Sequence, residues 1–284
     1  MRRIALVTDS TCDLPQEFRQ AHDIHVVPLS VIFGDENLLD GVTVTPEQFF
    51  QRLRTSAVHP STSQPAPGDF ANVYRQLLEQ YDQIISIHLS SALSGTYQAA
   101  QVAKDMFPDA DISLVDTRSA SVGLGWVVLL ASKAIAAGKS VAEVVDICQQ
   151  AAEQQHILLT VETLDWLERN GRIGKASALL GNLLNVRPIL QIEDGVVGVY
   201  EKARGKMEKV LNRMVAAMPG LVPNDRPVYL GVVHAERPEL AAKLAELVAE
   251  QYQVKEQMVT TVGPVIGVHT GPGTLGFVVV PAII

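Results

Sequence analysis

The sequence predicts an α/β protein of two domains. Its 284 residues exceed the usual size of one domain, which favours two. Strand and helix signals alternate through the first half, which predicts a Rossmann-like parallel sheet with helices on both faces over residues 1–155. The second half contains two apolar runs joined by a tight turn, which predicts an α+β domain with a mixed or antiparallel sheet over residues 156–284.

Short apolar runs predict the strands of the first domain. Helical stretches lie between or after these runs. The clearest helix start is Thr45-Pro46-Glu47-Gln48, because it supplies an N-cap hydroxyl, a proline at the first helical position and a capping-box glutamine. The predicted strands are residues 4–7, 26–33, 84–89 and 112–115.

The second domain is predicted from further runs of the same kind. Residues 186–192 and 196–200 flank a Glu-Asp-Gly turn, so these two strands are expected to pair antiparallel. The other predicted elements are helices at 206–218 and 239–251 and strands at 228–233, 254–261 and 275–280.

The composition argues against several classes of protein. A formal charge of -8 is unfavourable for a nucleic-acid binder or a basic membrane-surface protein. Cys12 and Cys148 lie far apart, which gives no disulfide framework and favours a reducing compartment. The apolar run at 4–7 is too short for a signal peptide, and the run at 126–137 falls short of the roughly 18 residues that span a bilayer. We therefore expect a cytoplasmic protein with no membrane span.

Four polar loops, three of them following apolar strands, are candidates for a ligand site. In one of them, Ser94-Gly95-Thr96 precedes a predicted helix, where free backbone N–H groups and a hydroxyl favour a carboxylate or phosphate. The alternative is an ordinary serine N-cap. The loops are residues 8–13, 61–65, 90–96 and 269–273.

Two further polar side chains have a functional and a structural interpretation. His269 is expected in a Gly-Pro-Gly turn between two strands, where the surrounding glycines suggest close approach of the backbone to another group, although most lone histidines are structural. Asp13 precedes Pro15 and is expected to cap the first helix rather than to bind a ligand.

Motifs for nucleotides, metals and nucleophilic elbows are absent. The stretch 171–177 resembles a P-loop only faintly, because its glycine spacing differs and Ala176 separates Lys175 from Ser177. There is no GxGxxG after a strand, no GxSxG and no HExxH or paired Cys/His signature. We expect neither a metal site nor a cofactor of its own.

Two segments are unusual in composition. Residues 169–209 contain eight basic and four acidic residues, which indicates either a face for an acidic partner or solvated helix faces. Residues 122–137 are apolar at almost every position, with interleaved small residues, which is typical of a buried helix and alternatively of the wall of an alkyl tunnel. The tunnel interpretation assigns the wall to Gly123, Trp126, Val127 and Leu130.

The loops, taken together and in order, resemble the DegV family over essentially the whole chain. The matching segments are Val7-Thr8-Asp9-Ser10-Thr11-Cys12-Asp13-Leu14-Pro15, Ser61-Thr62-Ser63-Gln64-Pro65, Leu89-Ser90-Ser91-Ala92-Leu93-Ser94-Gly95-Thr96-Tyr97, Arg169-Asn170-Gly171-Arg172-Ile173 and His269-Thr270-Gly271-Pro272-Gly273.

This resemblance implies a fatty acid buried between two domains. It implies a long-chain ligand such as palmitate, stearate or oleate, and a non-catalytic subunit whose bound carboxylate is phosphorylated by a separate ATP-binding kinase subunit. The acyl phosphate would feed phospholipid synthesis. Alternatives are a lipid storage or sensor protein without a kinase, and a serine hydrolase with Ser94 as nucleophile and His269 as base.

The resemblance also assigns residues. The carboxylate would be held by Thr62, Ser63, Ser94, Gly95 and His269. Residues behind this site or facing a partner would be Ser10, Arg169, Arg172, Arg204 and Thr270.

Overall fold

The computed structural model describes residues 3–179 and 186–283 of the chain. Within these ranges the first sheet is parallel, with the strand order β2-β1-β6-β7. The predicted parallel sheet is therefore confirmed. Its strands are β1 (Ile4–Asp9), β2 (Ile24–Val27), β6 (Gln83–His88) and β7 (Asp111–Asp116).

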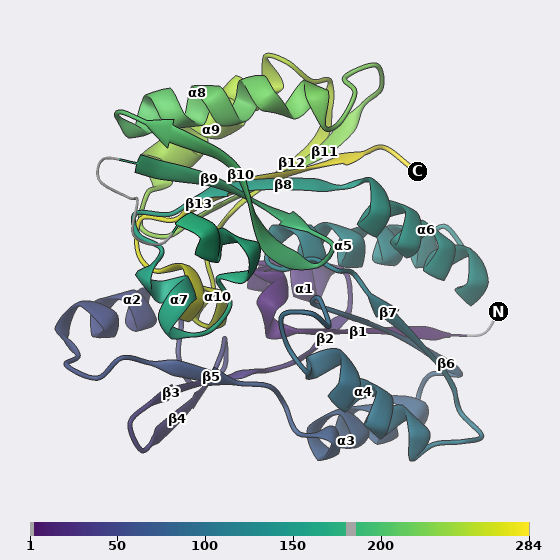
Figure 1. Cartoon of the computed structure of the whole chain (residues 1–284). Coiled ribbons are helices and arrows are strands. Elements are labelled where there is room, and N and C mark those ends of the chain that lie inside the picture. The colour runs from purple at the N-terminus through teal and green to yellow at the C-terminus, as the bar shows by residue number, and fades with distance from the viewer. Residues whose placement is uncertain (1–2, 180–185, 284) are drawn as a thin grey trace.

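Helices cover both faces of this sheet, as predicted (Figure 1). One face packs against α3 and α4 through an apolar cluster that includes Phe70, Tyr74 and Ala100. The other face packs against α5 and α6. The helices of this half are α1 (Gln16–Ala21), α2 (Pro46–Thr55), α3 (Pro67–Leu78), α4 (Thr96–Asp105), α5 (Val122–Ala136) and α6 (Val141–Gln154).

The capping box predicted for α2 is present. The Thr45 hydroxyl accepts from the Gln48 amide at 3.3 Å, and the Gln48 side chain accepts from the Thr45 amide at 2.9 Å. These reciprocal bonds satisfy two of the otherwise unpaired N–H groups at the helix start.

The predicted strand at 26–33 is wrong, because the segment forms two strands in two different sheets. β2 ends at Val27, and β3 (Ser30–Phe33) pairs instead with β4 (Glu36–Leu39) and β5 (Ser61–Ser63) in a small antiparallel sheet. The break falls at Pro28, which has no N–H for a sheet ladder. The following Leu29 amide donates to the Ser10 hydroxyl at 3.0 Å rather than to a strand.

The second half of the chain forms a six-stranded mixed sheet with the order β10-β9-β8-β13-β11-β12. Only β11 and β12 are parallel neighbours among its described strands. The β9–β10 hairpin turns at Asp194 and Gly195, both with positive φ, as a tight two-residue turn requires. The strands are β8 (His156–Thr160), β9 (Val186–Glu193), β10 (Val196–Arg204), β11 (Val228–His234), β12 (Val254–Thr261) and β13 (Leu275–Pro281).

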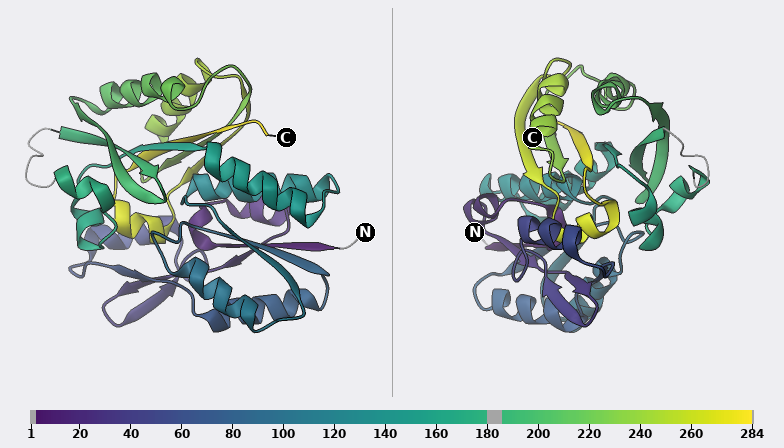
Figure 2. Two further views of the ribbon diagram at one scale, coloured as in Figure 1. Left: turned by 45° about the vertical axis from the view of Figure 1, so that its right-hand side comes forward. Right: turned by 90° about the vertical axis from the view of Figure 1, so that its left-hand side faces the viewer.

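The six-stranded sheet also lies between helices (Figures 1 and 2). Its outer face packs against α8 (Met207–Ala217) and α9 (Pro238–Ala249), which match the predicted helices. Shorter elements are α7 (Asp165–Arg169), α10 (Pro264–Thr270) and the 3-10 turns Ser10–Cys12, Gly174–Leu179 and Met218–Gly220.

Helix α5 is apolar all round because it lies between the two large sheets. It contacts β1 and β6 of the first sheet and β11 and β13 of the second. Trp126 packs on Tyr229 of β11, with ring centroids 4.9 Å apart. Gly125 allows close approach of the helix to the Cys12 carbonyl, which a Cβ at this position would meet at 2.7 Å. A helix buried on every side has no need of a polar face.

The chain passes from the first sheet's helices to the second sheet between α6 and β8. Because α6 ends at Gln154 and β8 begins at His156, we propose that the domain boundary lies at 155/156. No helix within residues 3–179 and 186–283 is both long and apolar enough to cross a membrane.

Candidate functional site

A cavity of about 370 Å³ lies where loops of the first half meet the second sheet and α10. Its volume is within the range of about 300–1,000 Å³ typical of small-molecule sites. Most of its wall is apolar. The apolar side chains come from both halves of the chain and are Leu29, Leu89, Leu93, Ala120, Val122, Ile157, Leu159, Leu167, Ile192, Val197, Val233, Val262, Val265, Ile266 and Phe277.

The polar part of the wall contains a group of side chains that we call the polar cluster: Thr62, Gln64, Ser94, Arg172 and His269. Thr62 Oγ1 lies 2.9 Å from His269 Nε2, although 207 residues separate them. The Gln64 carboxamide lies against Gly95, where a Cβ would collide with it. Sequence analysis had predicted Thr62, Ser94, Gly95 and His269 as one site, and the structure brings these residues together.

Thr62 is held by a strand rather than a loop. It lies in β5, opposite Val31 of β3. This extended backbone directs alternate side chains to opposite faces. Ser63 also lines the cavity.

His269 occupies the last turn of α10, so the prediction of a turn between two strands was wrong. Pro264 suits the first helical position, and Gly271 ends the helix with φ +75°. The glycine at 267 permits close packing, because a Cβ there would lie 2.6 Å from Phe49 of α2. Close backbone approach was therefore correctly inferred near His269, but at Gly267 the neighbour is a protein side chain.

The environment of His269 keeps its imidazole neutral at neutral pH. Burial, together with the nearby Arg172 guanidinium, lowers the pKa of His269 to about 4. Nε2 is engaged with Thr62, whereas Nδ1 is buried and has no hydrogen-bond partner in the described part of the chain. If Nε2 accepts from the threonine hydroxyl, the proton of the neutral ring is on Nδ1 and is available as a donor.

Ser94 lies just before α4 but does not cap it. Gly95 occupies the N-cap position, and the Ser94 hydroxyl accepts from the Thr96 amide at 3.3 Å and contacts the Thr96 hydroxyl at 2.9 Å. The ordinary N-cap alternative is thus wrong for Ser94. Its hydroxyl lines the cavity beside the amino end of a ten-residue helix.

Arg172 reaches the cavity but is engaged by backbone oxygens. Its Nε donates to the Leu93 carbonyl at 3.2 Å and an Nη donates to the Asn170 carbonyl at 2.9 Å. Asn170 in turn donates to the Val268 carbonyl at 3.0 Å. These bonds connect the segment after α7 to the Ser94 loop and to α10.

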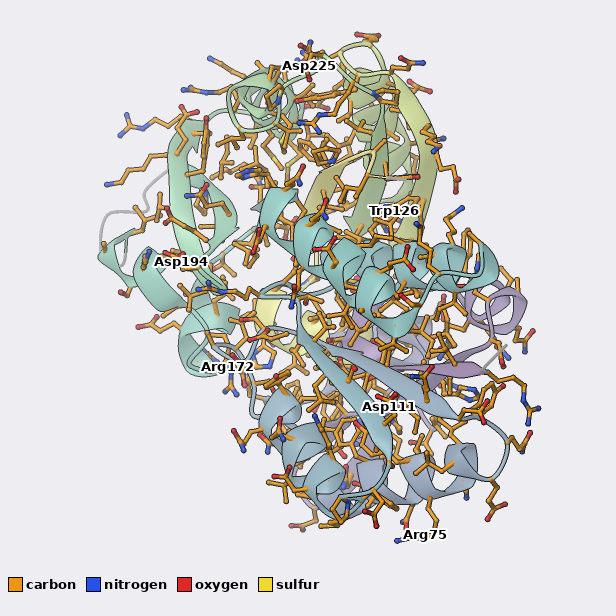
Figure 3. The ribbon with its side chains drawn as sticks, turned by 90° about the vertical axis from the view of Figure 1, so that its right-hand side faces the viewer. Arg75, Asp111, Trp126, Arg172, Asp194 and Asp225 are labelled. Atoms are coloured by element: carbon orange, nitrogen blue, oxygen red, sulfur yellow. The ribbon has the colours of Figure 1, made fainter. Side chains whose placement is uncertain are left out.

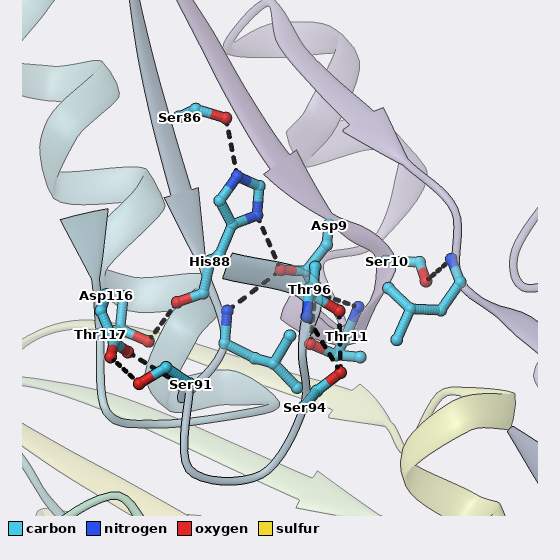
Figure 4. Close-up of polar contacts among 12 residues, drawn as sticks. Asp9, Ser10, Thr11, Ser86, His88, Ser91, Ser94, Thr96, Asp116 and Thr117 are labelled. Carbon is cyan, nitrogen blue, oxygen red and sulfur yellow. Dashed lines mark hydrogen bonds and ion pairs between the residues drawn. The ribbon is translucent and has the colours of Figure 1, made fainter. Parts of the chain in front are cut away.

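A buried chain of hydrogen bonds supports the loop that carries Ser94 (Figure 4). Asp9 Oδ2 accepts from the Leu89 amide and lies 3.0 Å from His88 Nδ1. His88 Nε2 lies 2.7 Å from the Ser86 hydroxyl, which accepts from Tyr74 at 2.9 Å. All four side chains are fully buried. Sequence analysis missed this network, although a histidine at the end of an apolar strand implies a buried partner.

Neither the Ser86–His88 arrangement nor the Ser94–His269 arrangement is that of an accessible nucleophile. Ser86, His88 and Asp9 have triad-like connections, but Ser86 is 0% exposed. Ser94 pairs with Thr96, and His269 pairs with Thr62 and has no carboxylate on Nδ1. The Ser94–His269 hydrolase alternative therefore lacks the hydrogen bond between nucleophile and base that it requires.

The other predicted site residues lie in different places. Thr270 lines the cavity, and the Ser10 hydroxyl lies behind it, bonded to the Leu29 amide. Arg169 and Arg204 are exposed and are not among the residues of the cavity wall.

The predicted tunnel wall lies further along α5 than the part of this segment that reaches the cavity. Gly123, Trp126, Val127 and Leu130 do not line this cavity, and the contribution of this segment comes from Ala120, Ser121 and Val122 instead. Figure 3 shows Trp126 well apart from Arg172. Only the start of α5 reaches the cavity, because the rest of the helix is covered by both sheets.

Comparisons with known proteins agree over the whole chain. The family described as "Uncharacterised protein, DegV family" matches residues 3–282. A DegV domain-containing protein from Deinococcus radiodurans is 37% identical over 286 residues, covering 98% of each chain. A DegV family protein from Thermus thermophilus, described as fatty acid binding, has a TM-score of 0.93 and 38% identity, covering 99% of this chain and 100% of that one.

A stearic acid-binding protein from Eubacterium ventriosum has a TM-score of 0.90 at 27% identity, covering 99% of this chain and 98% of that one. Fatty acid binding is thus a property of solved structures with the same fold. The family match spans both sheets and every loop of the polar cluster, and this chain therefore belongs to the DegV family.

Proposed function

We propose that this chain binds one long-chain fatty acid in the 370 Å³ cavity, with its carboxylate at Thr62, Ser94 and His269. The observation that carries the proposal is an apolar cavity whose polar cluster offers neutral donors. Each buried CH₂ contributes about 0.8 kcal/mol, so affinity comes chiefly from the acyl chain. The relatives described as binding fatty acid or stearic acid support the same ligand class.

The polar cluster supplies what a buried carboxylate needs. A carboxylate removed from water must accept hydrogen bonds or its charge becomes very costly. The Ser94 hydroxyl can donate. The Thr62–His269 pair supplies one further donor, which is the Thr62 hydroxyl when Nε2 carries the ring proton, or Nδ1 of the neutral His269 when Nε2 accepts from Thr62. Backbone N–H groups of Gly95 and the start of α4 add the favourable end of a helix dipole.

The same arrangement supports a role as the lipid-carrying subunit of a kinase. Two of the five N–H donors of Arg172 are bonded to backbone carbonyls, which holds the guanidinium in the Leu93 and Asn170 segments, so we propose that the carboxylate is held mainly by neutral donors and keeps much of its nucleophilicity. A separate ATP-binding subunit would then transfer phosphate to it, giving an acyl phosphate for phospholipid synthesis in the cytoplasm. Arg169 and Arg204, which are exposed, are available to such an acidic or phosphate-bearing partner. This chain would supply the substrate and no catalytic group.

Mass spectrometry of the purified protein tests the ligand. We expect organic extraction to release one fatty acid per chain with a narrow distribution of length, such as palmitate, stearate or oleate, because a cavity of limited volume selects chain length. Re-addition of palmitate or oleate to delipidated protein should restore the stoichiometry. Protein that releases no fatty acid and takes none up would contradict the proposal.

A transfer assay tests the role of the bound carboxylate. Loaded protein, mixed with the ATP-binding kinase subunit from the same cell and ATP, should yield acyl phosphate that hydroxylamine traps as a hydroxamate. The carboxylate oxygen bonds to the γ-phosphorus and ADP leaves, so ADP and hydroxamate should form in equal amounts. Each subunit alone should form neither. Binding without transfer would assign the chain to lipid storage or sensing.

A further inference from the structure

Two buried carboxylates, Asp13 and Asp40, lie behind the cavity and have no part in the proposed contact with ligand. They are 8% and 5% exposed, respectively. Sequence analysis expected Asp13 to cap the first helix, and this was wrong, because Pro15 occupies the N-cap of α1 and no side chain bonds there. Asp13 instead bonds to residues more than 100 positions away.

Asp13 connects the starts of two helices that reach the cavity. Its Oδ1 accepts from the Gly263 amide at 3.1 Å, and Gly263 is the N-cap of α10. Its Oδ2 accepts from the Ser121 hydroxyl at 2.5 Å, and Ser121 is the N-cap of α5. Ser121 itself lines the cavity with a φ of +54°, a region that serine rarely adopts.

Asp40 also lies beside Gly263. A Cβ at position 263 would lie 2.5 Å from Asp13 Oδ1 and 3.8 Å from Asp40 Oδ1. The Ser10 hydroxyl and the Val265 amide are close enough to Asp40 to favour its charged form. Its Oδ2 is nevertheless buried with no hydrogen-bond partner in the described chain. The glycine at 263 therefore lets the backbone approach both carboxylates closely.

The charges around the pair disfavour ionisation of both carboxyl groups at once. Burial raises the pKa of Asp13 well above its usual value, and the Asp40 and Asp9 carboxylates add to this, opposed by Ser121 and Gly263. Burial also raises the pKa of Asp40 to about 7, with Asp9 adding to the rise and Arg19 opposing it. The titratable or charged groups that face the pair are Asp9, Cys12 and Arg19.

Helix α10 connects this pair to the polar cluster. Its N-cap, Gly263, lies beside both carboxylates, and the helix ends with His269 and Thr270 at the cavity, with Val265 and Ile266 also in the wall. We propose that Asp13 and Asp40 are positioning residues that hold the start of α10 while only one of them is charged, so that His269 stays in place for the ligand carboxylate. This inference rests on the proposed fatty-acid function.

The sign of the pH effect follows from proton binding. The folded protein holds a proton on this pair more tightly than the unfolded chain does, so the stabilisation is complete at low pH and is lost as pH rises through about 7. Above that pH two adjacent buried charges repel each other beside Gly263. Fatty acid should then dissociate faster, because the start of α10 is held less firmly.

The experiment compares the rates of fatty-acid release at pH 8 and pH 6 in each protein, using a fluorescent long-chain fatty acid. For the unaltered chain, we expect release at pH 8 to be about fivefold or more faster than at pH 6. For Asp40→Asn, whose amide cannot ionise, we expect the two rates to be nearly equal. Asp23→Asn is the matched control, because Asp23 is exposed, and it should keep the ratio of the unaltered chain. An unchanged ratio in Asp40→Asn overturns the proposal.

Two additions keep the test decisive. If Asp40→Asn does not fold, Asp13→Asn serves the same purpose, because either amide removes the second charge. In lipid-free protein, the protection of residues 262–270 from hydrogen exchange should fall between pH 6 and pH 8. The fall should be larger in the unaltered chain than in Asp40→Asn. This second measurement needs no ligand, so failure of the fatty-acid function and failure of the positioning role are distinguishable.

Discussion

Replacing both Thr62 and Ser94 by alanine is expected to weaken fatty-acid retention by about 100-fold or more. A hydrogen bond to a charged group contributes about 1.5–3 kcal/mol, and the double substitution removes two hydroxyls from the proposed carboxylate site. At about 1.4 kcal/mol per factor of ten, the combined loss exceeds two orders of magnitude. Equilibrium binding of a fluorescent fatty acid, with the displaced natural ligand as competitor, measures the change.

The control for this experiment removes two hydroxyls outside the cavity. Thr55→Ala with Ser177→Ala is suitable, because Thr55 bonds only to the backbone of its own helix and Ser177 is exposed. Both double variants should unfold at similar denaturant concentrations. Equal fatty-acid retention by the Thr62/Ser94 variant and the control would show that the carboxylate does not bind at this site.

Replacing His88 by alanine is expected to lower the free energy of unfolding by about 3–5 kcal/mol. The substitution opens a cavity in a fully buried site and leaves Asp9 and Ser86 without the ring that joins them. The edge-to-face contact of His88 with Phe70, at 5.0 Å between centroids, is lost as well. Urea unfolding followed by circular dichroism gives the difference.

His25→Ala is the matched control for this substitution. The His25 side chain is 32% exposed in β2, at the edge of the parallel sheet, and its contact with Asp23 is long, at 3.7 Å. Its loss should cost less than about 1 kcal/mol. A His88→Ala variant as stable as this control would show that the Asp9–His88–Ser86 chain does not support the fold.

Local interactions explain which parts of the fold could be predicted. The capping box of α2 involves residues three apart, and the β9–β10 turn needs positive φ at two adjacent positions. Both are encoded within a few residues. The prediction of one strand at 26–33 failed because an apolar run specifies extended backbone and does not specify the sheet in which each part pairs.

The candidate site was likewise only partly predictable from the sequence. Hydroxyls, glycines and His269 could be selected as residues with suitable chemistry, and the order of their loops indicated the family. Their meeting could not be derived from spacing, because Thr62 contacts His269 across 207 residues and Asp13 contacts Gly263 across 250. The apolar pattern of α5 likewise could not distinguish a tunnel wall from a core helix, since both need apolar side chains on every face.

The sequence by itself determined the alternation of strands and helices, the antiparallel hairpin and the family, and it supplied the side chains proposed for the carboxylate. Only the tertiary structure decided that α5 is core, that α10 carries His269, and that Asp13 and Asp40 both lie beside the start of that helix. The physical reason is that backbone preferences and caps act over a few residues, whereas burial depends on which distant segments exclude water together.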